Sequence, residues 1–177
     1  MVTTTPTRRE DVKDPVGRTQ WPQNKGRDGE RTPMQWTPGP QAGFSTNPNT
    51  WLPIPPSAAS ANVQTEQKQP ASLLNWYKAL IALRRSSPAM RDGGVAIVDE
   101  KNANVLSFIR TAPASAKPVL VVLNMTANPQ TANIQLPDAG LKNRVPRTLL
   151  ASPGFATPRS LSSISLPPYS VWIATIE

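Results

Sequence analysis

Prolines are concentrated in the first part of this chain, and they restrict what that part can fold into. Eleven of the 21 prolines fall within the first 70 residues. Each proline fixes the backbone angle φ and removes a backbone hydrogen-bond donor. We therefore expect residues 1–70 to form an irregular segment without regular helices or central strands.

The same segment is rich in tryptophan, which argues against a disordered linker. Trp21, Trp36 and Trp51 are three of the five tryptophans of the chain, whereas disordered segments are poor in aromatic residues. A structureless stretch of this length is also uncommon inside a compact domain. We expect an ordered loop segment in which Trp36 and Trp51 anchor their loops in a core.

Residues 71–86 show the clearest helical pattern of the chain. Apolar residues recur at helical spacing from Leu73 to Leu83 and give a broad apolar face. Ser72 is a suitable N-cap, and Pro88 is expected to end the helix. So wide an apolar face predicts exposed apolar surface on this helix in the isolated chain.

From about residue 93 onward the pattern is that of short β-strands separated by turn residues. The VLVVLN run at 119–124 is apolar on both faces, which predicts a central strand. Apolar and polar residues alternate around Leu106 and Phe108, and again around Ile134 and Leu136. This alternation predicts a sheet with one face exposed to solvent. Seven or so such strands indicate an antiparallel β-sandwich, with expected strands at 95–99, 105–110, 119–125, 132–136, 147–150, 162–166 and 171–176.

Composition excludes several classes of site. The chain has no cysteine and no histidine, so thiolate or histidine metal sites, Ser-His-Asp triads and cofactor-binding thiols are absent. We expect no cofactor and no metal. The formal charge is +8, but the basic residues are scattered rather than arranged in a stripe, so we expect no nucleic-acid partner. No apolar run is long enough to span a membrane, and no signal peptide is recognisable, so we expect a cytoplasmic protein.

One ordered set of motifs covers nearly the whole chain. It opens at Gly26-Arg-Asp28 and centres on Arg31-Thr-Pro-Met-Gln-Trp36, and its later members are Trp51-Leu-Pro53, the 72–84 stretch and Leu166-Pro-Pro-Tyr169. This series resembles the C-terminal part of the oligo-1,6-glucosidases and maltases, which are α-glucosidases of the α-amylase superfamily. Members of that family combine a (β/α)8 barrel with a C-terminal antiparallel β domain.

The resemblance implies a domain organisation for the chain. Residues 1–70 correspond to the loop segment after the last barrel strand, residues 71–90 to the last barrel helix, and residues 91–177 to the C-terminal β domain. Met1 then matches an internal methionine of the family. We therefore expect a fragment that lacks most of the catalytic barrel, and that has either been truncated or joins a separately encoded barrel half.

The resemblance also implies a chemistry and one site residue. Family members are retaining glycosidases, which need a carboxylate nucleophile and a carboxylic acid/base, and the family places both on earlier barrel strands. We expect no catalytic residue in this chain and no activity from it alone. Arg31, and more weakly Arg27, match an arginine that pairs with a barrel aspartate and holds hydroxyls of the terminal glucose of an oligosaccharide substrate.

Other interpretations of these residues stay open. Arg31 could simply tie its loop to Asp28 or Glu30, and local charge pairing is the expected role of both acids. The alternative function is a non-catalytic carbohydrate-binding or scaffolding β module, in which exposed aromatics such as Tyr169 or Trp172 would carry the binding.

Overall fold

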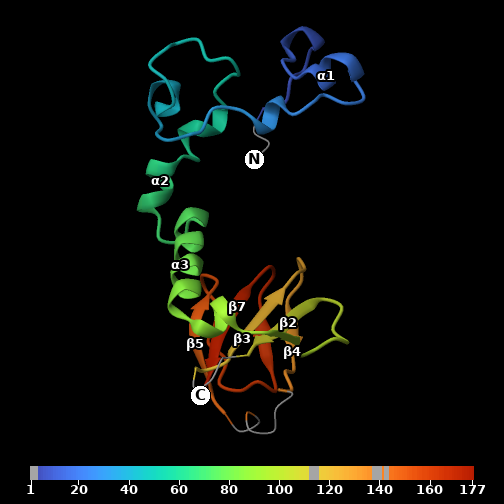
Figure 1. The fold of residues 1–177 in the computed structure, drawn as a ribbon, viewed down its shortest axis with the longest axis vertical. Helices are drawn as coiled ribbons and strands as arrows, with labels where there is room; N and C mark the ends of the chain where they lie inside the picture. Colours follow the sequence, from blue (N-terminus) through green and yellow to red (C-terminus); the bar gives the residue numbers. More distant parts are fainter. Residues whose placement is uncertain (1–3, 112–115, 137–140, 142–143) are drawn as a thin grey trace. The chain divides into compact units, whose positions relative to one another are not determined.

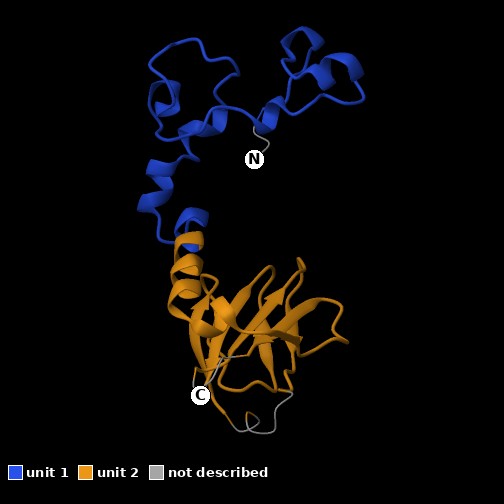
Figure 2. Cartoon of the chain, viewed as in Figure 1, with its two compact units in different colours: residues 1–76 blue, residues 77–177 orange. Residues whose placement is uncertain are grey.

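The computed structural model describes residues 4–111, 116–136, 141 and 144–177 of the chain. Met1 lies outside these residues. The chain divides into two compact units, Met1–Trp76 and Tyr77–Glu177 (Figure 2). Each unit is described by itself below.

The first unit is built from loops and short helical turns, in agreement with its proline content. The expectation that it holds no regular helix was wrong at two places, α1 (Pro15–Gln20) and α2 (Val63–Lys68). Pro15 is the first residue of α1, where a missing N–H costs nothing. Helix α2 contains no proline and begins after the N-cap Asn62. Four 3-10 turns complete the described part of the unit, at Arg9–Asp11, Asp28–Glu30, Pro40–Gly43 and Pro56–Ala59.

The long helix expected at 71–86 is α3, which spans Leu73–Ser86. The hydroxyl of Ser72 accepts a hydrogen bond from the Asn75 amide at 3.2 Å, which confirms the predicted N-cap. The Glu66 carboxylate accepts a second one from the Leu74 amide at 3.0 Å. Helix α3 ends before Pro88, which becomes the first residue of a further short helix, α4 (Pro88–Asp92).

Helix α3 presents apolar side chains on more than one side. Leu80 and Leu83 pack against a buried cluster of the β domain, and Figure 1 shows α3 beside the five-stranded sheet. On another side, Leu73, Tyr77 and Ile81 follow one another at intervals of four residues and are 66%, 58% and 50% exposed. This stripe confirms the expected exposed apolar surface.

No helix within the described ranges is long and apolar enough to cross a bilayer.

The β domain contains seven strands among the described residues, in two antiparallel sheets (Figure 1). The larger sheet has the order β1-β2-β3-β7-β5 and the smaller one pairs β4 with β6. Strand β3 is the middle strand, as its apolar sequence predicted. The bounds are β1 Val95–Ile97, β2 Val105–Arg110, β3 Val119–Asn124, β4 Gln130–Ala132, β5 Pro146–Ala151, β6 Ile164–Leu166 and β7 Val171–Ile176.

Both faces of the larger sheet pack against other elements. One face meets the smaller sheet in the main core, which holds residues such as Leu120, Ile164 and Trp172. On the other face a second buried cluster includes Val121 and Ile173, and Leu80 and Leu83 pack against it. In β2 the main core receives Val105, Ser107 and Ile109, while Leu106 is 41% exposed. The predicted orientation of β2 was therefore wrong. Strand β4 also ends at Ala132 rather than at residue 136, although Ile134 and Leu136 are still buried.

Candidate functional site

Arg31 lies in an ion pair that the sequence motif did not predict. Its Nη1 atom is 3.2 Å from Oδ2 of Asp14, which is 17 residues earlier in the chain. The Asp14 side chain is 2% exposed and the Arg31 side chain is 44% exposed. The buried carboxylate thus binds one nitrogen of the guanidinium, while the arginine side chain stays partly exposed.

Asp14 is itself fixed by the start of α1. It is the N-cap of that helix, and its Oδ1 atom accepts hydrogen bonds from the amides of Val16 at 2.8 Å and Gly17 at 3.3 Å. The loop that carries Arg31 approaches closely through Gly26, which has φ of +72°. A Cβ atom at Gly26 would lie 2.7 Å from Cβ of Asp14, so only glycine fits at this position.

The surroundings of Asp14 favour its charged form. Burial of the carboxyl group would raise its pKa, but hydrogen bonds from backbone N–H groups of α1 and of Arg27 lower it. The positive charge of Arg31 acts in the same direction. The net result is that the pKa of Asp14 lies below its ordinary value.

This pKa shift predicts a pH dependence of the site. The folded-state pKa of Asp14 is depressed, so its contribution to stability is present above the unfolded pKa of about 3.9 and is lost as the pH falls through the lower folded value. We expect the amide signals of Val16 and Gly17 to titrate below about pH 4 in NMR spectra.

The matched control for this titration is Asp14→Asn. It should abolish the titration of both amide signals and remove the acid-induced loss of stability in the same pH window. Amide signals that titrate at or above the ordinary aspartate pKa would contradict the assignment.

Arg31 also lines a surface cavity of about 350 Å³ within the first unit. The side chains of Phe44 and Trp51, 51% and 69% exposed, form part of its wall. Asn47 and Asn49 add amide groups. A guanidinium, amides and exposed aromatic faces together suit a ligand with many hydroxyls and apolar C–H faces.

Arg27 lies near the same carboxylate at a greater distance. Its Nε atom is 3.9 Å from Oδ2 of Asp14, and its side chain is 63% exposed. The structure therefore brings Arg27 and Arg31 together around one aspartate. Whether either residue holds a sugar stays a prediction.

One of the simpler interpretations was wrong. Neither Asp28 nor Glu30 forms an ion pair with Arg27 or Arg31 among the described contacts; both arginines face Asp14 instead. Trp36 and Trp51 are 48% and 69% exposed, and their role as loop anchors, with the barrel of the family as the packing partner, stays a prediction.

Asp14 is the site residue that sequence reasoning missed. Its local signal was the Asp14-Pro15 pair, since aspartate is a good N-cap and proline is favoured at the first helical position. The expectation that proline excludes helix hid this signal. The pairing with Arg31 has no local signal, because it depends on the path of the intervening loop.

The β domain offers little support for an aromatic sugar-binding surface. Trp172, which the alternative function needs exposed, is fully buried and stacks on Phe155 with ring centroids 6.2 Å apart. Its indole nitrogen donates to the Thr148 hydroxyl at 2.9 Å. The expectation of an exposed Trp172 was therefore wrong, whereas Tyr169 is 68% exposed as expected.

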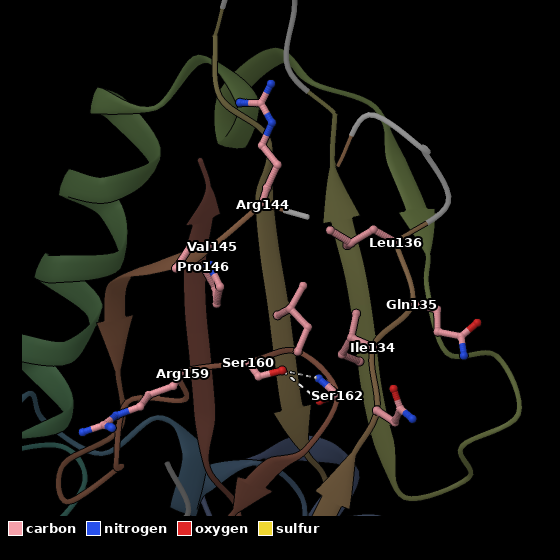
Figure 3. Close-up of a pocket in the computed structure, with 11 residues that line it drawn as sticks. Ile134, Gln135, Leu136, Arg144, Val145, Pro146, Arg159, Ser160 and Ser162 are labelled. Atoms are coloured by element: carbon pink, nitrogen blue, oxygen red, sulfur yellow. Dashed lines mark hydrogen bonds between the residues drawn. The ribbon is translucent and has the colours of Figure 1, made fainter. Parts of the chain in front are cut away.

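The β domain also contains a cavity of about 730 Å³ (Figure 3). Figure 3 shows Ile134 and Leu136 on one side of it and the hydrogen-bonded Ser160 and Ser162 nearby, while the guanidinium of Arg159 extends away. Among the described residues, its lining includes no acidic and no aromatic side chain. The described part of the wall therefore offers neither a carboxylate for glycoside hydrolysis nor a ring for sugar stacking.

No group of three or more acidic, histidine or cysteine side chains within the described residues could hold a metal ion. Of the carboxylates near Arg31, Asp14 is committed to the start of α1 and to the arginines. An oxygen of the Asp28 carboxylate accepts a hydrogen bond from the Lys13 amide at 2.6 Å.

Comparison with protein families places both halves of the chain. Residues 2–93 match the family model described as alpha amylase, catalytic domain. Residues 95–173 match the model described as maltogenic amylase, C-terminal domain. The boundary between the two matches lies between α4 and β1.

Several curated proteins are similar to part of the chain. Maltase A2 of Drosophila melanogaster is 43% identical over 101 residues, which are 56% of this chain and 18% of that protein. The trehalose synthase/amylase of Mycobacterium tuberculosis is 37% identical over 117 residues, 62% of this chain and 20% of that protein. The oligo-1,6-glucosidase of Bacillus cereus is 34% identical over 110 residues, 58% of this chain and 18% of that protein.

Solved structures give the same result. The trehalulose synthase from Pseudomonas mesoacidophila superposes with a TM-score of 0.78 at 27% identity, over 99% of this chain and 34% of that one. The isomaltulose synthase from Klebsiella gives a TM-score of 0.72 at 28% identity, over 86% of this chain and 26% of that one. The chain spans about a fifth of the length of the curated relatives that it matches. With half of its length matched by the catalytic-domain model and most of the rest by the C-terminal model, the chain belongs to the alpha-amylase family.

Proposed function

We propose that this chain is the C-terminal part of a retaining α-glucosidase that acts on short α-glucosides. The observation that carries the proposal is the anchored arginine: Arg31 is held by Asp14 at 3.2 Å beside a cavity with exposed aromatic and amide groups. In this arrangement the outer donors of the guanidinium grip hydroxyls of the terminal glucose. The nucleophile and the acid/base belong to a barrel segment, supplied within a longer chain or as a separate chain.

The names of the relatives support the class of reaction. They are described as an oligo-1,6-glucosidase, a maltase and a trehalose synthase, and the similar structures are described as a trehalulose synthase and an isomaltulose synthase. All of these names refer to the cleavage or the synthesis of sugars. We therefore propose α-glucosyl chemistry on short oligosaccharides as the activity to which this chain contributes.

A chimeric enzyme tests the proposal. The stretch of the Bacillus cereus oligo-1,6-glucosidase that aligns with this chain would be replaced by the chain itself. We expect the chimera to cleave a chromogenic α-glucoside, because the barrel of the relative supplies the carboxylates. We expect the purified 177-residue chain to show no turnover.

The control for the chimera is the Bacillus cereus enzyme cut off before the stretch that is to be replaced. This shortened enzyme should be inactive. A folded chimera without activity would contradict the proposal. So would turnover by the chain alone that disappears on changing Asp28 or Glu30 to the amide.

A further inference from the structure

Two short segments of the first unit are linked through the carboxylate of Asp28. Its Oδ2 atom accepts a hydrogen bond from the Lys13 amide at 2.6 Å, and Lys13 directly precedes Asp14. In return, the backbone N–H of Arg27, which directly precedes Asp28, acts on the Asp14 carboxylate and lowers its pKa. Each aspartate therefore faces the amide of the residue that precedes the other.

Asp28 also holds the backbone of Arg31. Its carbonyl oxygen accepts a hydrogen bond from the Arg31 amide at 3.1 Å, at the end of the Asp28–Glu30 turn. The Arg31 side chain reaches Asp14, with Nη1 3.2 Å from Oδ2. The contacts thus form a closed circuit, which runs from Asp28 to Lys13, along the chain to Asp14, across to Arg31 and back to Asp28.

Glycines near Asp28 let the chain segments lie this close together. A Cβ atom at Gly29 would lie 2.6 Å from the carbonyl oxygen of Thr4, just as one at Gly26 would meet Asp14. Because neither position has room for a side chain, backbone packing holds the turn on both sides. We therefore expect the turn to keep its place when the Asp28 carboxylate is changed.

The Asp28 carboxylate is poorly suited to a purely stabilising role. The side chain is 2% exposed, and its buried Oδ1 atom has no hydrogen-bond partner among the described residues. The cost of such an atom is comparable to the contribution of the hydrogen bond that Oδ2 accepts. Proteins keep locally unfavourable groups mainly where a functional site needs a particular geometry.

We propose that Asp28 is a positioning residue for the pair of Asp14 and Arg31. It fixes the separation of the two segments, so that one guanidinium nitrogen meets the buried carboxylate while the Arg31 side chain stays partly exposed. Asp28 itself is buried and acts only through these two residues. Its importance for a substrate rests on the proposed function of Arg31, since small misplacements of a binding group lower rates strongly.

The titration of Asp14 in the full chain reports whether Arg31 is in place, because the positive charge of Arg31 lowers the pKa of Asp14. The readout is the midpoint of the Val16 amide signal in NMR spectra. Asp28→Ala and Asp28→Asn both remove the charge, but only the asparagine side chain keeps an oxygen for the Lys13 amide. We expect a higher midpoint for Asp28→Ala than for Asp28→Asn, closer to the ordinary aspartate value of about 3.9.

Kinetics of the chimera test the same role independently. Asp28→Ala should lower kcat/KM for a chromogenic α-glucoside by at least about tenfold, and Asp28→Asn should restore most of the loss. In a chimera that already carries Arg31→Ala, Asp28→Ala should cause no further loss, because no guanidinium is left to position. A merely structural role of Asp28 would lower activity by the same factor in both backgrounds.

Glu30→Gln is the matched control, since Glu30 lies in the same turn and is exposed. It should change neither the midpoint nor the kinetics, whereas Arg31→Gln marks the midpoint without a guanidinium. Asp28→Leu, which also lacks an acceptor, replaces the alanine variant should that variant not fold.

Equal midpoints for Asp28→Ala and Asp28→Asn would overturn the role of Asp28, and so would equal losses of kcat/KM with and without Arg31. An inactive chimera with unchanged Asp28 would count against the proposed function alone. The titration in the full chain would still decide whether Asp28 positions the pair.

Discussion

Replacement of Trp172 by alanine is expected to remove a large part of the stability of the β domain. Loss of a fully buried tryptophan costs about 3–5 kcal/mol in other proteins, against a total of about 5–15 kcal/mol for a typical domain. Trp172 has no exposed surface, stacks on Phe155 and donates to Thr148. It also lies on β7, which pairs with both β3 and β5, so a cavity there loosens the middle of the sheet.

Urea denaturation followed by near-ultraviolet circular dichroism measures this loss. Trp172→Phe is the control, because it keeps an aromatic ring against Phe155 and gives up only part of the volume and the indole N–H. We expect it to lose clearly less stability than the alanine variant. An alanine variant within about 1 kcal/mol of the unchanged chain would show that Trp172 is not a core residue.

Replacement of Arg31 by alanine in the chimera is expected to lower kcat/KM for an α-glucoside by about 100-fold. Hydrogen bonds that involve a charged group contribute about 1.5–3 kcal/mol each, which corresponds to a loss of this order. The loss should be smaller for Arg31→Lys, about tenfold, because lysine keeps the charge but lacks the rigid donor fork. Steady-state kinetics on each variant gives the values.

Arg8→Ala is the matched control for this series. Arg8 is also a surface arginine in an ion pair, with Asp11 at 2.8 Å, but it does not line the cavity that Arg31 lines. It should keep the kinetics of the unmodified chimera. A larger loss for Arg27→Ala than for Arg31→Ala would assign the sugar contact to Arg27 and contradict the present assignment.

Local patterns were sufficient to predict much of the β domain. The predicted strands at 105–110 and 171–176 have the observed bounds, because six-residue runs of β-branched and apolar residues between turn residues favour little else. The N-cap at Ser72 was also predictable from local sequence, because the hydrogen bond of a cap joins residues only three positions apart. The sequence did not predict which side chains of β2 point into the main core, because either face of that strand could be buried.

The candidate site was predictable only in part. The motif around Arg31 identified the loop, and the resemblance supplied a role for the arginine. Asp14 could not be identified as its partner, because an ion pair over 17 residues depends on how the loop folds back. The exposure of Trp36 and Trp51 was equally hidden, since a tryptophan is apolar enough for a core and polar enough for a surface.

The sequence by itself determined the family, the proline-rich character of the first unit and the strand content of the second, because motif identity and short-range periodicity depend only on neighbouring residues. Only the tertiary structure decided that Asp14 holds Arg31 and that Asp28 and Trp172 are buried. Each of these depends on groups brought together by loops and sheet pairing. Their energies come from burial and exact distance, which the order of residues alone does not specify.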